Sequence, residues 1–182
     1  MKKIAVQLAE GFEEIEAITI IDVLRRAEFE VVVISITEKL VVTGAHNIKI
    51  IADQLFENTN YKTIDMIVLP GGMPGAVNLN NHTGLKKEII EFNKKGKQLG
   101  AICAAPLVLG ELGILKNKNA TCYPGFENRL EGAKTTENNI ELAENVITGK
   151  GAGVAMEFAL KIVEKFKGRE FADELGAKMI VQ

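Results

Sequence analysis

The sequence has few of the residues that many catalytic and structural sites need. Two cysteines and two histidines occur among its 182 residues. Two cysteines cannot form the disulfide framework of a small secreted protein, and no signal peptide is recognisable, so we expect a cytoplasmic protein. Both histidines, His46 and His82, precede Cys103. This order excludes a catalytic triad whose histidine follows the cysteine.

Several other patterns are also missing. No apolar run approaches the roughly 20 residues that cross a bilayer, so no membrane role is expected. The net charge of -2 comes without a long basic stripe, which argues against nucleic acid as the main partner. Neither Cys103 nor Cys122 has a CxxC or HExxH context, so no metal site is expected. The loop at 149–153 lacks the GxGxxG spacing, so no dinucleotide cofactor is expected either.

What the sequence does contain is an alternation of short apolar runs with amphipathic stretches. We expect strands at 3–8, 30–36, 66–69, 98–102, 120–122 and 145–148, and helices at 13–27, 83–95, 105–112 and 154–167. Residues 40–51 are typical of a hairpin beside the main sheet. The alternation predicts one domain over 1–182, with a flavodoxin-like, doubly wound, mostly parallel sheet and helices on both faces. Such sheets bind ligands at the carboxyl ends of their strands.

Cys103 lies where one of these strands ends, in the stretch LGAICAAP. Free cysteine is common in protein cores, so one interpretation is a small buried apolar side chain. The other is a nucleophile on a tight turn, with the following helix aiming free N–H groups at the sulfur and lowering its pKa. The small residues around Cys103 allow close backbone approach and favour the second interpretation.

The first predicted helix offers a candidate acid for this thiol. Steps of three and four residues along its apolar stripe lead back to Glu16, which places a carboxylate on the buried face. Burial raises the pKa of a glutamate, so Glu16 could stay protonated and donate to a thiolate. Glu13 and Glu14 are interpreted as first-turn acids that complement the helix dipole. His82 is expected to cap a helix, and His46 to be exposed in the hairpin.

Four blocks carry a resemblance to a known family: GFEEIEAITIIDVLRRA, IVLPGGMPGAVNL, GAICAAPLVLGELG and GKGAGVAMEFALKIVE. In this order they resemble the ThiJ/PfpI superfamily, in the branch of the parkinsonism-associated deglycase. The resemblance implies a flavodoxin-like homodimer with Cys103 as a readily oxidised nucleophile and Glu16 as the protonated acid bonded to it. It also implies that Gly72 and Ala104 donate backbone N–H groups to an oxyanion or a sulfinate, with Gly71 as a secondary candidate beside them.

The sequence departs from that superfamily at informative positions. The protease-like branch has a histidine directly after the cysteine, where this chain has Ala104. Tyr123 stands where eukaryotic members have a histidine near the nucleophile, and a phenol with a reference pKa of about 10 is a poor base. His46 matches a family arginine thought to approach the partner's site.

Three functions follow from the resemblance. The first is a cysteine-dependent enzyme acting on reactive dicarbonyls or glycated adducts, as a glyoxalase or deglycase, with a small aldehyde or glycated compound as substrate. The second is a redox-sensing protective protein or chaperone without turnover. The third is an intracellular peptidase or amidase, which the residue after Cys103 disfavours.

Overall fold

The computed structural model describes residues 1–181 and is organised around a seven-stranded sheet. The strand order is β10-β11-β7-β6-β1-β2-β5, and all neighbours are parallel except β10 and β11. The strands are β1 (Lys3–Leu8), β2 (Glu30–Ser35), β5 (Gln54–Leu55), β6 (Met66–Leu69), β7 (Gln98–Ile102), β10 (Ile140–Ala143) and β11 (Val146–Gly149). The structure therefore confirms the predicted α/β class with a mostly parallel sheet.

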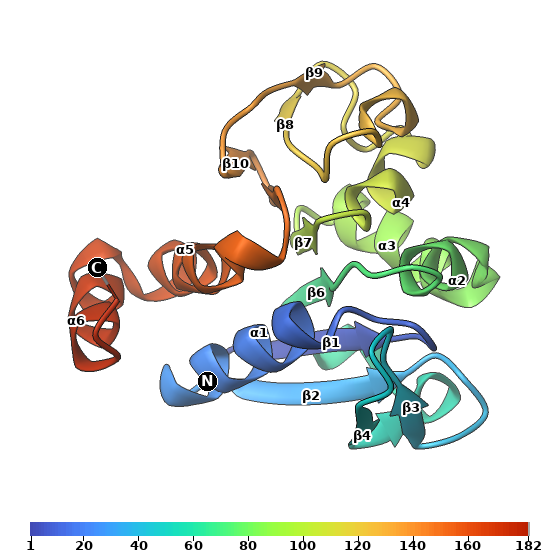
Figure 1. Cartoon of the computed structure of the whole chain (residues 1–182), viewed down its shortest axis with the longest axis horizontal. Helices are drawn as coiled ribbons and strands as arrows, with labels where there is room; N and C mark the ends of the chain where they lie inside the picture. The colour runs from blue at the N-terminus through green and yellow to red at the C-terminus, as the bar shows by residue number, and fades with distance from the viewer. Residues whose placement is uncertain (182) are drawn as a thin grey trace.

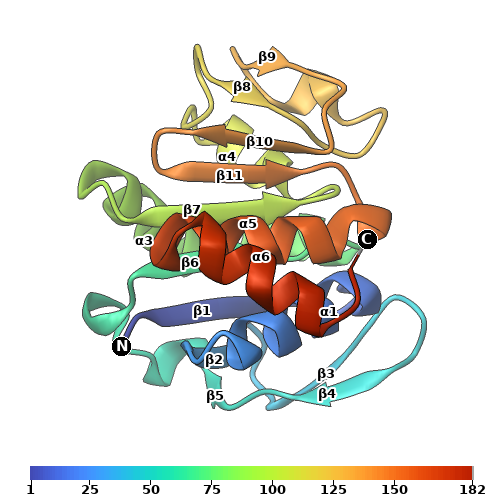
Figure 2. The same cartoon turned by 90° about the vertical axis from the view of Figure 1, so that its left-hand side faces the viewer.

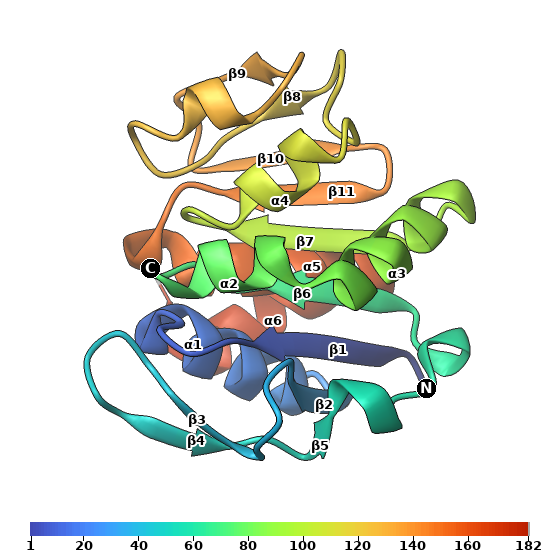
Figure 3. The ribbon, with the colours of Figure 1, turned by 90° about the vertical axis from the view of Figure 1, so that its right-hand side faces the viewer.

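Helices cover both faces of this sheet. One face carries α1 (Glu14–Arg26), α5 (Ala155–Lys167) and α6 (Arg169–Lys178), which lie in front of the strands in Figure 2. The other face carries α2 (Gly75–Asn81), α3 (Thr83–Lys94) and α4 (Pro106–Glu111), seen in Figure 3. Short 3-10 turns occupy Phe56–Asn58, Tyr61–Thr63, Glu127–Arg129 and Ala152–Val154.

The alternation of side chains along β1 explains the two cores. Ile4, Val6 and Leu8 join the core beneath α1 and α5, whereas Ala5 and Ala9 join the core beneath α2 and α3. Successive residues of a strand point to opposite faces, so a strand that is buried on both faces is mostly apolar. Gln7 is the buried polar exception in β1, and its side chain accepts a hydrogen bond from the Tyr61 hydroxyl at 2.9 Å. A buried central strand of this kind fixes where the loop after it emerges, at the carboxyl end of the sheet.

Two small sheets lie outside the main one. The hairpin of β3 (Val41–Thr43) and β4 (Lys49–Ile51) extends beside the end of β2, as expected (Figure 1). The second pairs β8 (Asn119–Ala120) with β9 (Lys134–Thr135). The expected strand at 120–122 is therefore wrong in its extent. Thr121 and Cys122 follow β8, and the Thr121 amide donates instead to the Thr148 hydroxyl at 3.0 Å.

Most other predicted elements occur within a residue or two of their expected bounds. The sequence analysis missed α2, α6, β5, β9 and β10. No helix among residues 1–181 is both long and apolar enough to span a membrane.

Candidate functional site

Cys103 occupies a strained turn at the carboxyl end of β7. Its φ of +63° lies in the left-handed region, which residues other than glycine rarely adopt. Two backbone hydrogen bonds hold the turn: the Cys103 amide donates to the Gly149 carbonyl at 2.9 Å, and the Tyr123 amide donates to the Cys103 carbonyl at 2.8 Å. This arrangement lifts the thiol from the sheet edge and leaves it partly exposed.

Glu16 reaches the same place from the first turns of α1. Its side chain is completely buried, and its Oε2 atom accepts a hydrogen bond from the Gly71 amide at 2.7 Å. The carboxyl group is also a hydrogen-bond partner of the Cys103 thiol. Its other oxygen, Oε1, is buried and has no hydrogen-bond partner among residues 1–181. One carboxyl oxygen is therefore fixed, and the other is free to carry a proton.

Burial dominates the electrostatics of this pair. It raises the pKa of Glu16 to about 7, against the lowering effect of the Gly71 hydrogen bond. Burial and the neighbouring Glu16 carboxylate raise the pKa of the Cys103 thiol to about 12. The expected lowered pKa at Cys103 is therefore wrong, because desolvation and a like charge outweigh the backbone N–H groups.

Two such close groups titrate as a unit. The pair holds two protons below a pH of about 7 and a single proton from there to about 12. The single proton can reside on Glu16, which leaves a thiolate at Cys103. The backbone amides of Gly72 and Ala104 act to lower the pKa of the thiol and so favour that form. The resemblance implied the same two residues as donors to an oxyanion or a sulfinate, and that role stays a prediction.

Glycine is required at position 71 by this crowding. A Cβ atom there would lie 2.7 Å from the Cys103 Cβ and 2.9 Å from Glu16 Oε2. Both distances are shorter than real contacts, so any larger residue would push the thiol and the acid apart. Gly71 therefore serves the site in two ways, through its amide and through its missing side chain.

A cavity of about 220 Å³ opens beside Cys103. It is lined by Glu13, Gly72, Met73, Cys103, Ala104, Tyr123 and Phe126. Tyr123 is half exposed, and its ring faces Phe126 edge-on with centroids 6.5 Å apart. Larger hollows lie near His82 and between α5 and α6, but neither is lined by Cys103. The cavity at Cys103 is the candidate site because a reactive group opens into it.

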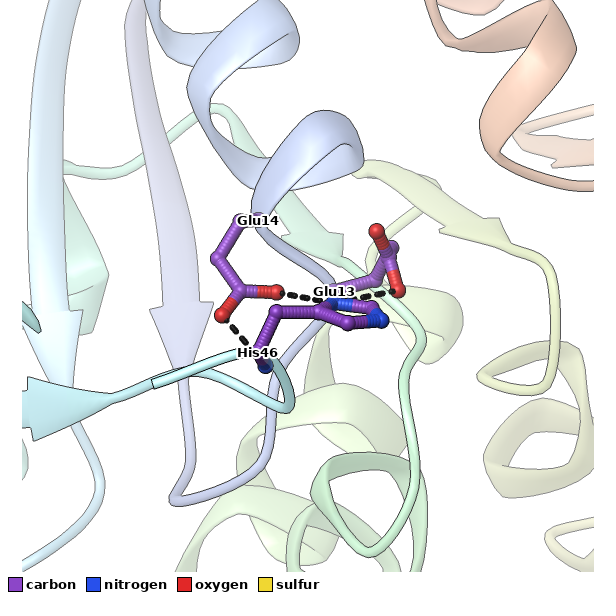
Figure 4. A group of neighbouring side chains, drawn as sticks. All are labelled: Glu13, Glu14 and His46. Atoms are coloured by element: carbon purple, nitrogen blue, oxygen red, sulfur yellow. Dashed lines mark hydrogen bonds and ion pairs between the residues drawn. The ribbon is translucent and has the colours of Figure 1, made fainter. Parts of the chain in front are cut away.

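The structure places His46 at the rim of this region. The side chain is exposed, as expected, and its Nδ1 lies 2.9 Å from Glu14 Oε2 and 3.7 Å from Glu13 Oε2 (Figure 4). Hydrogen bonding to Glu14 raises the pKa of His46, and the pKa of the Glu14 carboxyl is held below its usual value by its hydrogen bonds to the hairpin. One carboxylate oxygen each from Glu13 and Glu14 and one ring nitrogen of His46, atoms of the kind that bind metals, lie within 4.8 Å of one another. Both carboxylate oxygens of Glu14 already accept hydrogen bonds from the hairpin, so we interpret the cluster as a contact that holds the hairpin against α1 and not as a metal site.

Sequence reasoning missed what Glu13 and Glu14 do. Glu14 is buried and accepts from the amides of His46 and Ile48, at 2.6 Å and 3.3 Å. Glu13 lines the cavity. A position in the first turn of a helix does not indicate that Glu14 contacts the hairpin or that Glu13 lines the cavity. The one available signal is that Glu13 follows the carboxyl end of β1, the edge of the sheet where ligands bind. His82 caps α3 as predicted: its Nδ1 accepts from the Leu85 amide at 3.0 Å.

Comparison with known proteins decides the family. The family model described as "DJ-1/PfpI family" matches residues 2–165. The chain belongs to the DJ-1/PfpI family. Protein DJ-1 homolog B of Arabidopsis thaliana is 37% identical over 183 residues, covering 100% of this chain. The chain spans 42% of that relative's length and 46% of a second plant relative's, so it is less than half as long as either.

Two other members are similar over nearly their whole length. A protein named glutathione-independent glyoxalase DJR-1.2, from Caenorhabditis elegans, is 37% identical, with 91% of this chain and 89% of that protein covered. The solved structure described as oxidized DJ-1 of Toxoplasma gondii has a TM-score of 0.95 at 35% identity, covering 99% of this chain and 98% of that one. The DJ-1/PfpI fold therefore extends over almost all the described residues.

Proposed function

We propose that this DJ-1/PfpI protein is a cysteine-dependent enzyme that converts small 1,2-dicarbonyl aldehydes into hydroxy acids. The observation that carries the proposal is the buried Glu16 carboxyl against the Cys103 thiol, with a cavity open on the sulfur. A homologue named glutathione-independent glyoxalase supports the same chemistry. Repair of glycated amines would begin with the same nucleophile and is the alternative activity that the assay below distinguishes.

The first step is addition of the Cys103 thiolate to the aldehyde carbon. A C–S bond forms, the carbonyl π pair moves to oxygen, and that oxygen takes a proton from Glu16 to give a hemithioacetal. The backbone amides of Gly72 and Ala104, which act to lower the pKa of the thiol, also help to stabilise the negative charge that forms on the carbonyl oxygen before the proton arrives.

The second step moves a hydrogen between adjacent carbons. Ionised Glu16 removes the C1 proton, its electron pair forms a C1–C2 double bond, and the π pair of the C2 carbonyl moves to the C2 oxygen. Glu16 then returns the proton to C2 while the C1 hydroxyl passes its proton to the C2 oxygen, so that C1 becomes the carbonyl of a hydroxy-acid thioester. Water then hydrolyses the thioester, releases the acid and restores the thiol. A carboxyl with a pKa of about 7 can both accept and donate a proton near neutral pH.

Conversion of methylglyoxal to lactate tests this proposal. We expect lactate from the wild-type protein above the buffer-catalysed background, and only background from Cys103→Ser. Equal lactate yields from the two proteins would remove the enzymatic proposal. Fructosylated amino acids, assayed in parallel, distinguish glyoxalase from deglycase activity.

The second candidate function is redox sensing at the same thiol. Glu16 and the two backbone amides surround the sulfur with groups that could hold a sulfinate, and one solved family member is described as oxidized. After mild peroxide we expect a mass increase of two oxygen atoms localised to Cys103, with a different extent in Glu16→Gln. No oxidised species at Cys103 would count against this function.

The peptidase alternative receives no support from the geometry. Among residues 1–181, neither histidine lines the cavity at Cys103. His82 lies against Phe56 with its Nδ1 committed to the Leu85 amide, and His46 is committed to Glu14. We therefore do not propose amide hydrolysis.

We further propose that the chain forms one domain that assembles as a homodimer in the cytoplasm. Exposed apolar side chains occur on α1 at Ile15 and Ile18, and on the adjoining hairpin at Val41, Ile48 and Ile51. The Glu14 contacts join these two elements, so their apolar groups form a surface suited to a second copy. Sedimentation should give a dimer for the wild type and a monomer for Ile18→Lys, and a monomeric wild type would exclude the assembly.

A further inference from the structure

We propose that Glu13 is a charge filter at Cys103, which disfavours anionic electrophiles and admits uncharged ones. If the protein turns over dicarbonyls as proposed above, the filter predicts that it prefers uncharged dicarbonyl substrates to carboxylate-bearing ones such as glyoxylate. This prediction of substrate class rests on the proposed function. The filter itself is a property of the thiol's surroundings. It can therefore be measured whether or not the protein turns over a substrate.

The residues among 1–181 that line the cavity at Cys103 include one carboxylate and no cation. Glu13 is the charged side chain among the described residues that line it, and no lysine or arginine joins it there. The remaining walls come from Met73, Phe126 and Tyr123, together with the small residues next to Cys103. An approaching anion therefore meets a carboxylate and apolar groups, with no cation to receive it.

The position of Glu13 is fixed by the backbone. Its amide donates to the Gly71 carbonyl at 3.0 Å, which joins the N-terminus of α1 to the loop that supplies Gly72 to the sulfur. Its side chain is 15% exposed, so water screens its charge less than at an open surface. The charge of Glu13 also contributes to the raised pKa of Glu16, after the larger effect of burial.

The nearest cation compensates Glu13 only in part. His46 Nδ1 is 3.7 Å from Glu13 Oε2 but only 2.9 Å from Glu14 Oε2, so its proton is directed mainly to Glu14 (Figure 4). With both acids ionised and His46 protonated, this cluster keeps one net negative charge. The pair formed by Glu16 and Cys103 adds another once it has lost its first proton, so the cavity is negative near neutral pH.

Alkylation of Cys103 by two reagents of similar size tests the filter. Iodoacetamide is neutral and iodoacetate is anionic, and peptide mapping reports the rate of each at Cys103 separately from Cys122. The measured quantity is the neutral-to-anionic rate ratio, divided by the same ratio for 2-mercaptoethanol, a free thiol without a carboxylate, in the same low-salt buffer. Because both rates come from one thiol, changes in the ionisation of Cys103 cancel.

We expect the wild-type ratio to exceed that of the free thiol, and Glu13→Gln to lower it by at least roughly fivefold, which is the effect of one unit charge about 4 Å away in bulk water. His46→Gln should raise the ratio, because it removes the partial compensation. Glu170→Gln, which makes the same charge change at an exposed position of α6, should leave it unchanged. Equal ratios in wild type and Glu13→Gln would overturn the filter.

A substrate comparison separates this proposal from the proposed function. If wild type makes lactate, Glu13→Gln should raise the rate with glyoxylate relative to methylglyoxal, and an unchanged relative rate would contradict the filter. If wild type makes no lactate, the enzymatic proposal fails, and the alkylation ratios still decide the role of Glu13. Circular dichroism of each variant at the assay temperature checks that the fold is retained.

Discussion

The carboxyl group of Glu16 lies against the thiol of Cys103, although Glu16 belongs to α1 and Cys103 follows β7, the third strand of the main sheet from its β10 edge. The parallel order of β1, β6 and β7 makes this meeting possible, because the loops after these strands emerge at one edge. Gly71, between the two side chains, ties the acid in place through its amide.

Gly71→Ala should separate the acid from the thiol. The added methyl would lie too close to both the Cys103 Cβ and Glu16 Oε2, so we expect a loss of roughly 1–3 kcal/mol in unfolding free energy. Gly153→Ala is the matched control, because no atom lies within 4 Å of its added Cβ. Denaturant unfolding of both variants measures the difference, and equal losses would show that the crowding at Gly71 is easily relieved.

Glu14→Ala should loosen the hairpin. It leaves the amides of His46 and Ile48 without their acceptor, and an unpaired buried donor costs roughly 1–3 kcal/mol. We expect faster hydrogen exchange of amides in 41–51 and a lower unfolding free energy. Glu170→Ala is the control, since it removes an exposed carboxylate on α6, away from the hairpin. Unchanged exchange in Glu14→Ala would show that other contacts hold the hairpin.

Stability should depend on pH through Glu16. Its pKa rises from 4.5 to about 7 on folding, so the folded protein binds more protons than the unfolded chain between these values. The unfolding free energy therefore falls as the pH rises through that interval, by up to roughly 3 kcal/mol. The raised pKa of His46 also favours the folded state at lower pH, and that contribution is lost as the pH rises.

Glu16→Gln isolates the contribution of Glu16, because His46 is common to both proteins. The difference in unfolding free energy, wild type minus variant, should decrease between about pH 5 and about pH 8. Urea titrations at the two pH values give this difference. A difference that stays constant would mean that Glu16 has the same pKa in the folded and unfolded chains.

Tyr123→His should raise the rate of lactate formation if the proposed reaction is correct. The ring at this position lines the cavity, and imidazole is a far better base than a phenol near neutral pH. Tyr123→Phe is the control for the loss of the hydroxyl alone. Lactate formation measured with both variants at neutral pH checks this, and equal rates in the two would show that no base is needed there.

The sequence allowed a good part of the site to be predicted. The helical stripe back to Glu16 and the strand end at Cys103 are local patterns, and the structure places both residues together. The direction of the Cys103 pKa could not be predicted, because it depends on burial by residues far away in sequence. Glu14 and His46 meet across the hairpin, and neither residue alone indicates that contact.

The missed elements have similar reasons. α2 is short and contains Gly75 and several asparagines, and it is held by burial of Ala76 and Leu79 rather than by helix propensity. α6 is mostly polar, with few buried residues. β10 is an edge strand that pairs with one neighbour, so it lacks the continuous apolar run of a central strand.

The pH dependence of Cys103 alkylation by iodoacetamide, in wild type and in Glu16→Gln, tests the central claim most directly. A coupled pair predicts a wild-type rate with an inflection near pH 7, where the pair loses its first proton, and no such inflection in the variant. A single step near the free-thiol value of about 8.5 in both proteins would contradict the account.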